Sequence, residues 1–118
     1  RSRGLGDVYK RQLPYCDYIV IARGDLGNVM PLSELPKVQA YIAKVCKEHN
    51  KNFMVVTQML DSMIRNPYPT RAEVNDIYHA VHQGANALML TGETAHGRYP
   101  VEAMKMLVET ANGSLEEL

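Results

Sequence analysis

Short apolar runs alternate with amphipathic stretches along this chain. The runs occupy positions 18–22, 53–56 and 87–90, and they consist mainly of β-branched and other apolar side chains. Apolar runs without alternating polar positions are typical of strands that are covered on both faces. The stretches between the runs repeat apolar side chains at three- and four-residue steps, as amphipathic helices do. The pattern therefore predicts strands and helices in alternation.

The helix predicted after the first run has a clear apolar face. Its buried positions follow the helical step, at Leu35, Val38, Ile42 and Val45. Ser33 is placed to act as the N-cap of this helix, and Pro36 fits its first turn. We expect this helix to cover one face of the sheet.

Two further helices have recognisable ends. Thr70 and Glu73 form a capping box, in which the threonine oxygen bonds the third helical N–H and the glutamate reaches back. Gly84 is suited to the left-handed residue that ends this helix. Pro100 starts the last helix, and Gly113 is predicted to close it.

The polar residues that follow the three apolar runs are evenly spaced. The interval from Arg23 to Thr57 is 34 positions, and the interval from Thr57 to Thr91 is also 34. Each interval holds one strand and one crossover helix, which is the repeat of a parallel sheet with right-handed connections. The sequence therefore predicts the α/β class, with three parallel strands and intervening helices.

Composition narrows the classes of protein. The 118 residues contain 46% hydrophobic and 22% charged residues, so the chain has the material for a modest core. Lys+Arg and Asp+Glu are both 13, which argues against nucleic acid or an anionic membrane as a partner. The apolar runs are far shorter than the roughly 20 residues of a membrane span. We expect a soluble, cytoplasmic protein with Cys16 and Cys46 as reduced thiols.

Residues 1–12 differ from the rest of the chain. They do not begin with Met, they carry four of the basic residues, and they show no helical or strand periodicity. Positions 7–12 resemble an in-frame reading of a sequencing adapter. We interpret residues 1–12 as a non-native or disordered segment and residues 13–118 as the folded part. An ordinary flexible basic tail has a similar composition, and the encoding nucleotides would distinguish the two.

The residues at the strand ends form a chemically useful set. Asp25 suits a hard cation such as Mg²⁺, and the backbone N–H groups of Gly24 and Asp25 suit an anionic oxygen. Thr57 can donate a directional hydrogen bond, and Glu93 can relay a proton from what the flanking glycines predict to be a mobile loop. This set favours phosphoryl transfer or enolate chemistry on a small anion. A simple tight turn at 23–27 is the plain alternative.

Four ordered motifs closely resemble pyruvate kinase. They are the segments 21–27, 56–63 and 69–73, and the segment 90–95 with Gly97 and Tyr99-Pro100 after it. The resemblance extends from about Leu13 to Ala111. It implies a (β/α)₈ barrel, of which these strands would be the sixth, seventh and eighth. It also implies the reaction of phosphoenolpyruvate with ADP to give pyruvate and ATP.

The resemblance assigns roles at the first two strand ends. Asp25 would be a ligand of Mg²⁺, with Mn²⁺ as a possible substitute. The backbone N–H groups of Gly24 and Asp25 and the hydroxyl of Thr57 would hold the substrate, and Arg23 would support this substrate-binding turn. Thr57 is therefore both a substrate-binding and a candidate catalytic residue.

At the third strand end, the resemblance makes Glu93 the group that delivers a proton to the enolate. Thr91 replaces a commoner serine but keeps the hydroxyl, so it stays a substrate-binding residue. The catalytic lysine of the family and a second Mg²⁺-binding glutamate belong to an earlier strand, where this chain has only its anomalous first residues. We therefore expect residues 1–118 alone to lack kinase activity.

The resemblance also implies features of the whole enzyme. It predicts a requirement for K⁺ and a homotetramer, with phosphoenolpyruvate, pyruvate, ADP and ATP as its small-molecule partners. Neither nucleic acid nor a membrane is an expected partner.

Two other interpretations remain at this stage. The chain could belong to another Mg²⁺-dependent barrel enzyme that acts on phosphoenolpyruvate or pyruvate, and the upstream gene sequence would distinguish it. It could also be a non-catalytic module that binds a small anion or associates through its strand edges. Sedimentation with and without phosphoenolpyruvate and Mg²⁺ would test the latter.

Overall fold

The computed structural model describes residues 11, 13–57 and 59–116. The prediction for residues 1–12 therefore lies outside the described residues, apart from position 11. The elements follow in the order η1 (Leu13–Tyr15), β1 (Tyr18–Ala22), α2 (Arg23–Gly27), η2 (Leu32–Glu34), α3 (Leu35–Glu48), β2 (Asn52–Val56), η3 (Asp61–Ile64), α4 (Arg71–His82), β3 (Ala87–Met89), α5 (Gly92–Ala95) and α6 (Pro100–Leu115), where η marks a 3₁₀-helix.

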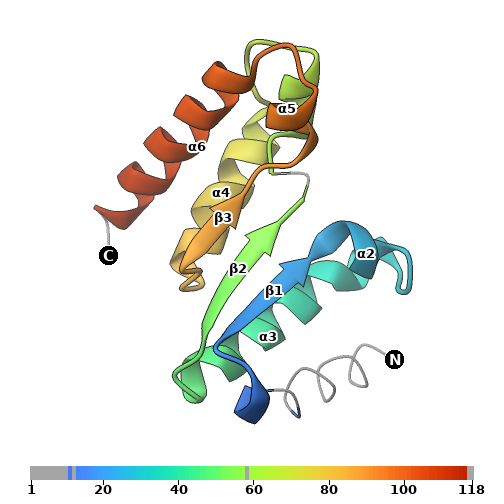
Figure 1. Cartoon of the computed structure of the whole chain (residues 1–118), viewed down its shortest axis with the longest axis vertical. Helices are drawn as coiled ribbons and strands as arrows, with labels where there is room; N and C mark the ends of the chain where they lie inside the picture. Colours follow the sequence, from blue (N-terminus) through green and yellow to red (C-terminus); the bar gives the residue numbers. More distant parts are fainter. Residues whose placement is uncertain (1–10, 12, 58, 117–118) are drawn as a thin grey trace. The chain divides into compact units, whose positions relative to one another are not determined.

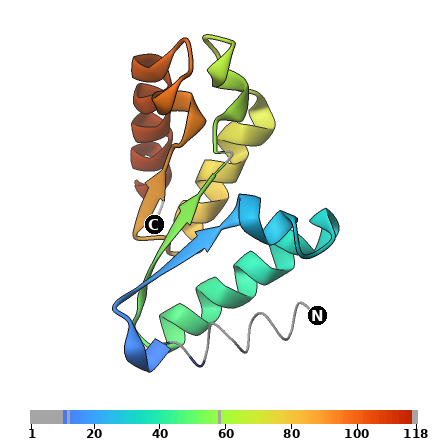
Figure 2. The same ribbon diagram turned by 45° about the vertical axis from the view of Figure 1, so that its right-hand side comes forward.

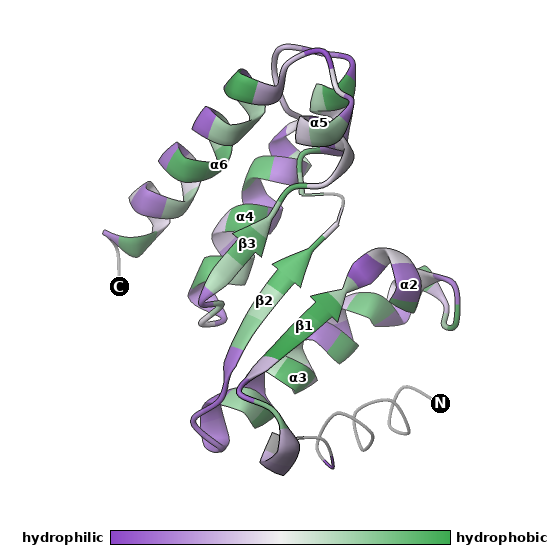
Figure 3. Cartoon of the chain, viewed as in Figure 1, coloured by the Kyte–Doolittle hydropathy of each residue, from purple (hydrophilic) through white to green (hydrophobic). Residues whose placement is uncertain are grey.

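The three strands form one sheet. Their order is β1-β2-β3, and the three arrows point in the same direction in Figure 1. The strands are among the most apolar parts of the chain, as Figure 3 shows. Strands that alternate with helices and run parallel confirm the predicted α/β class, and they agree with part of a (β/α)₈ barrel.

The chain divides into two compact units that are interleaved in sequence. Unit 1 comprises residues 1–55 and 83–88, and unit 2 comprises residues 56–82 and 89–118. Unit 1 holds β1, α2, α3 and most of β2 and β3. Unit 2 holds η3, α4, α5 and α6. The candidate residues after β1 therefore belong to unit 1, and those after β2 and β3 belong to unit 2.

In unit 1, α3 packs along β1, as Figures 1 and 2 both show. The helix buries an apolar face made by Val38, Ile42, Ala43, Val45 and Cys46. On the strands, Ile19, Ile21, Phe53 and Val55 are all less than 5% exposed. The side chains of Gln39 and Gln83 join α3 to the segment before β3 through a hydrogen bond of 2.8 Å. The core of this unit is therefore one helix layer against the sheet.

The prediction that β1 is covered on both faces is wrong for the described part of the chain. Ile19 and Ile21 are buried, whereas Tyr18 is 39% and Val20 is 45% exposed. Burial alternates because α3 packs against only one face of the strand and side chains point alternately to the two faces. An apolar run shows what a strand is made of, but not how many layers cover it.

In unit 2, α4 packs against α6, and α5 packs against both α6 and η3. Figures 1 and 2 show α4 and α6 side by side in both views. Fully buried side chains come from each of these elements, among them Met63, Ile77, Ala80 and Ala103. His82 joins α4 to the end of α6, since its Nε2 lies 3.1 Å from the carbonyl oxygen of Ser114.

Most of the predicted helix boundaries are confirmed, and two are wrong. The capping box forms, since Glu73 N–H donates to Thr70 Oγ1 at 3.2 Å. Gly84 has the expected positive φ of 96°. Ser33 is not the N-cap of α3, because η2 occupies 32–34 and Glu34 becomes the cap. Gly113 does not end α6, because the helix continues to Leu115 and buries Ser114.

Candidate functional site

The first strand runs directly into the short helix α2. Arg23 opens this helix and is only 9% exposed, and Leu26 is buried beside it. Asp25 lies in the first turn of α2 and is exposed. Backbone N–H groups of a first helical turn are directed to partners outside the helix. The end of β1 is thus a short helix anchored by Arg23 and Leu26, with the Asp25 side chain directed to solvent.

Thr57 follows β2 in an uncommon backbone conformation. Its φ is +72°, in the left-handed region, and its side chain is half-buried. A β-branched residue is a genuine outlier in this region, and such strain concentrates at functional sites. The structure therefore marks Thr57 as a position whose backbone is held in place by its surroundings.

Glu93 is the most constrained of the candidate residues. Its side chain is 1% exposed, although it is a carboxylate. Thr91 N–H donates to its Oε1 at 2.9 Å, and Leu60 N–H donates to its Oε2 at 2.9 Å. Buried carboxylates need such donors, because burying an unpaired charge costs much free energy. Each oxygen of Glu93 therefore has a fixed partner, and the carboxylate is held in one orientation.

The prediction of a mobile loop around Glu93 is wrong. The segment forms α5, which packs closely against η3. Arg98 N–H donates to the carbonyl oxygen of Ile64 at 2.9 Å. A Cβ added to Gly97 would lie 2.6 Å from the carbonyl oxygen of Glu93. Gly97 therefore permits a close approach of two backbones, and it does not act as a hinge.

Sequence reasoning missed the group that holds Glu93 Oε2 and a second role of Glu73. Leu60 supplies its backbone N–H, which no side-chain pattern reveals. Glu73 was predicted only as a helix cap, yet its carboxylate also accepts hydrogen bonds from the backbone and the hydroxyl of Ser62. One signal in the sequence points to the contact between Ser62 and Glu73. Ser62 is a small polar residue on a short turn that precedes the capping box.

The structure brings together some of the predicted site residues. Thr91 and Glu93 are hydrogen-bonded to each other, and Thr57 belongs to the same unit. Arg23, Gly24 and Asp25 lie together on α2 in unit 1. Parallel strands predict that Asp25, Thr57 and Glu93 lie at one common end of the sheet, and this stays a prediction.

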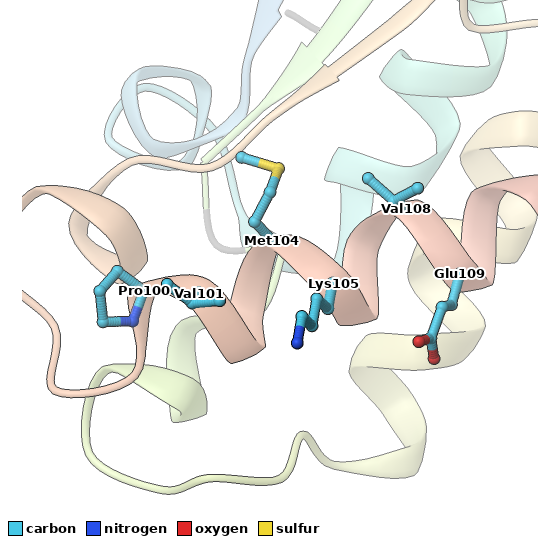
Figure 4. Close-up of a pocket in the computed structure, with 6 residues that line it drawn as sticks. All are labelled: Pro100, Val101, Met104, Lys105, Val108 and Glu109. Carbon is cyan, nitrogen blue, oxygen red and sulfur yellow. The ribbon is translucent and has the colours of Figure 1, made fainter.

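A hollow in unit 2 is separate from these residues. It runs along α6 and is lined by Pro100, Val101, Met104, Lys105, Val108 and Glu109, as Figure 4 shows. Its lining is one outer helix face with two charged side chains of opposite sign. None of the predicted site residues contributes to it, so we do not assign the site to it.

Within residues 11, 13–57 and 59–116, no group of three or more His, Cys, Asp and Glu side chains is placed to hold a metal ion. A Mg²⁺ ion needs no such group, because it takes one or two carboxylates together with water and substrate oxygens. No helix in the same range is long and apolar enough to cross a membrane.

Comparison with known proteins gives one consistent result. The family model of the pyruvate kinase barrel domain matches residues 8–104. A pyruvate kinase of Thermotoga maritima is 51% identical over 102 residues, which cover 86% of this chain and 22% of that protein. A pyruvate kinase of Chlamydia muridarum is 53% identical over 91 residues, which cover 77% of this chain and 19% of that protein.

A solved structure agrees with these relatives. The crystal structure of a pyruvate kinase from Cryptosporidium parvum matches 83% of this chain and 20% of its own, with a TM-score of 0.81 and 38% identity. The chain thus spans about a fifth of the length of the proteins that it matches.

Proposed function

This chain belongs to the pyruvate kinase family, and we propose that it forms part of a cytoplasmic pyruvate kinase. The whole enzyme transfers the phosphoryl group of phosphoenolpyruvate to ADP and yields pyruvate and ATP. In this proposal, residues 13–118 are the C-terminal part of the catalytic barrel, and residues 1–12 are not native to it, although the match to the family model begins at residue 8. The remaining parts of the site belong to the rest of the enzyme.

The observation that carries the proposal is the fixed carboxylate of Glu93. When the P–O bond of phosphoenolpyruvate breaks, the electron pair stays on the enolate oxygen, and the phosphoryl group bonds to a terminal oxygen of ADP. The enolate carbon must then gain a proton, which Glu93 would first take up from water and then pass on. A carboxylate that is 1% exposed and held by two N–H groups has one orientation in which to relay that proton.

The other candidates hold the substrate. The N–H groups of Gly24 and Asp25 would bind an anionic oxygen, on a helix that the buried Arg23 anchors. Thr57 would donate its hydroxyl from a strained backbone position, so that little reorganisation is needed when the substrate binds. Thr91 would contribute a second hydroxyl beside Glu93.

Asp25 is the residue on this chain that fits a Mg²⁺ ligand. Its side chain is exposed, and a single carboxylate with water and substrate oxygens is a usual Mg²⁺ environment. The ion, or Mn²⁺ in its place, would neutralise charge on the substrate oxygens. A requirement for K⁺ and a homotetramer are proposed for the whole enzyme, on the strength of family membership alone.

The chain by itself is proposed to be inactive, because the lysine that would stabilise the enolate is expected on an earlier strand. Purified residues 1–118 should form no pyruvate from phosphoenolpyruvate, ADP, Mg²⁺ and K⁺ in an assay coupled to lactate dehydrogenase. Turnover above that of heat-denatured chain would contradict this part of the proposal.

A chimaera tests the function itself. The segment of the Thermotoga maritima enzyme that aligns with this chain is replaced by the residues of this chain. The chimaera should form pyruvate only with both ADP and Mg²⁺. A chimaera that folds and assembles like the parent enzyme but does not turn over would refute the proposed function.

Variants of the chimaera then separate the proposed role of Glu93 in proton transfer from that of Asp25 as a Mg²⁺ ligand. Glu93→Gln should lower kcat by about 10² to 10⁴, the range of general acid–base catalysis, with little change in the Mg²⁺ requirement. Asp25→Asn should instead raise the Mg²⁺ concentration for half-maximal rate roughly tenfold, a change worth about 1.4 kcal/mol. Glu109→Gln, on the exposed face of α6, is the matched control and should change neither.

A further inference from the structure

The turn after β2 gives two of its backbone N–H groups to two different carboxylates. Leu60 N–H donates to Glu93 Oε2 at 2.9 Å, and Ser62 N–H donates to Glu73 Oε2 at 2.8 Å. The donors lie two residues apart on one turn, whereas Glu93 comes from α5 and Glu73 from α4. One turn therefore contacts both carboxylates.

Glu73 does more than a capping box requires. In a capping box the glutamate returns one hydrogen bond to the N–H of the cap residue, and here Thr70 N–H donates to Glu73 Oε1 at 2.8 Å. The same oxygen also accepts from Ser62 Oγ at 2.5 Å, a short distance that is typical of a hydroxyl on a charged carboxylate. Ser62 thus gives this carboxylate two hydrogen bonds, one from its N–H and one from its hydroxyl.

The charge of Glu73 agrees with this arrangement. Burial of the carboxyl would raise its pKa, but the hydrogen bonds from Ser62 and Thr70 outweigh burial and leave the pKa below its usual value. The group is therefore a carboxylate at neutral pH and can accept from all of its donors.

The far end of the turn is held independently. Arg98 N–H donates to the carbonyl oxygen of Ile64 at 2.9 Å, a contact in which Glu73 takes no part. Loss of the Glu73 carboxylate would therefore remove two hydrogen bonds from Ser62 and leave the contact between Arg98 and Ile64 in place. The two contacts of Glu93 would respond differently, since Thr91 lies on its own segment and Leu60 does not.

We propose that Glu73 is a positioning residue for Glu93: by holding Ser62, it places the N–H of Leu60 where it fixes Glu93 Oε2. The inference deepens the proposed function and rests on Glu93 being the group that relays the proton. Glu73 touches no reacting atom in this arrangement and acts only through the turn.

Amide hydrogen exchange on the full chain tests the contact directly. In ¹⁵N-labelled Glu73→Gln, the Leu60 amide should exchange at least about tenfold faster than in the unchanged chain, because its carboxylate partner is no longer aligned. The Thr91 amide should change less than twofold. Ser62→Ala, which removes the hydroxyl donor and keeps the N–H, should give an intermediate effect at Leu60.

Thr70→Ala is the matched control for helix capping. It removes the capping oxygen of α4 but leaves both contacts between Glu73 and Ser62 in place. The Leu60 amide should then change less than twofold. If Thr70→Ala accelerates exchange at Leu60 as much as Glu73→Gln does, Glu73 acts only by stabilising α4, and the proposal is overturned.

The chimaera supplies a second measurement that does not depend on the isolated chain. Glu73→Gln should lower kcat roughly tenfold with KM for phosphoenolpyruvate within twofold, as expected when a catalytic group is misplaced. Thr70→Ala should leave both constants within twofold. An active chimaera whose kcat is unchanged by Glu73→Gln overturns the positioning role. If the chimaera is inactive without any further substitution, that result counts against the proposed function instead. The exchange rate of the Leu60 amide then still tests whether Glu73 positions the hydrogen bond from Leu60 to Glu93.

Discussion

Asp25 and Glu93 hold similar places in the fold but have opposite environments. Each lies at the start of a short helix that follows a strand of the same sheet. Asp25 is exposed, whereas Glu93 is 1% exposed and accepts two backbone hydrogen bonds. An exposed carboxylate can share a cation with water and substrate, and a buried one with fixed donors keeps one orientation. The surroundings of a strand-end carboxylate, more than its position, decide its chemistry.

The largest expected effect is the loss of stability when the carboxylate of Glu93 is removed. Glu93→Ala leaves the buried N–H of Leu60 and the half-buried N–H of Thr91 without their acceptor, and we expect it to lower the free energy of unfolding by about 2 to 4 kcal/mol. Asp25→Ala is the matched control and should change it by less than about 0.5 kcal/mol. Urea denaturation followed by circular dichroism measures both. Equal effects would mean that the two environments do not differ as described.

The second effect concerns the close approach that packs the Glu93 segment. Gly97→Ala places a Cβ against the carbonyl oxygen of Glu93 and should cost about 1 to 3 kcal/mol of unfolding free energy. Gly113→Ala is the control, because Gly113 lies inside α6 with open space around it. That change should instead stabilise the chain by about 0.5 to 1 kcal/mol. A tolerated Gly97→Ala would show that α5 is not tightly docked on η3.

A smaller effect tests the strain after β2. Thr57→Gly removes the cost of a β-branched residue at positive φ and should raise the free energy of unfolding by about 1 kcal/mol. In the chimaera the same change should lower activity, since the hydroxyl is lost. Asn50, with a φ of 55° in unit 1, is the control, because asparagine tolerates this region and Asn50→Gly should be nearly neutral. Equal effects of Thr57→Gly and Asn50→Gly on the free energy of unfolding would contradict stored strain at Thr57.

The smallest effect is the pH dependence that Glu73 contributes. Its pKa is lower in the folded chain than the ordinary glutamate value of about 4.3. Its stabilising effect is therefore complete above that value and is lost as the pH falls through the folded pKa. The difference in unfolding free energy between the unchanged chain and Glu73→Gln should shrink below about pH 4. Urea titrations between neutral and acidic pH measure it, and a constant difference would contradict the assignment.

Local patterns predicted the elements well. The apolar run at 18–22 is the strand that the structure contains, and the other two strands differ from the predicted ranges by one residue at one end. The capping box of Thr70 and Glu73 and the left-handed Gly84 were also predicted. These features depend on a few neighbouring residues, and the sequence displays those directly.

Contacts between distant segments could not be predicted in the same way. Gly92 and Gly97 suggested mobility because glycine is locally flexible. In the structure both lie in close contact with Ile64, and a Cβ on Gly97 would also lie 2.6 Å from the carbonyl oxygen of Glu93. The donor from Leu60 to Glu93 joins residues 33 positions apart through a backbone group that every residue has. Sequence patterns therefore indicated which residues carry the chemistry, but not how the carboxylate of Glu93 is fixed.

The interleaving of the two units limits how this chain can be taken apart. The chain passes between them at 55/56, 82/83 and 88/89. No truncation from either end yields unit 1 or unit 2 alone, and a single proteolytic cut leaves them covalently joined. To express one unit by itself, its two segments would have to be spliced into a new gene with an engineered connection.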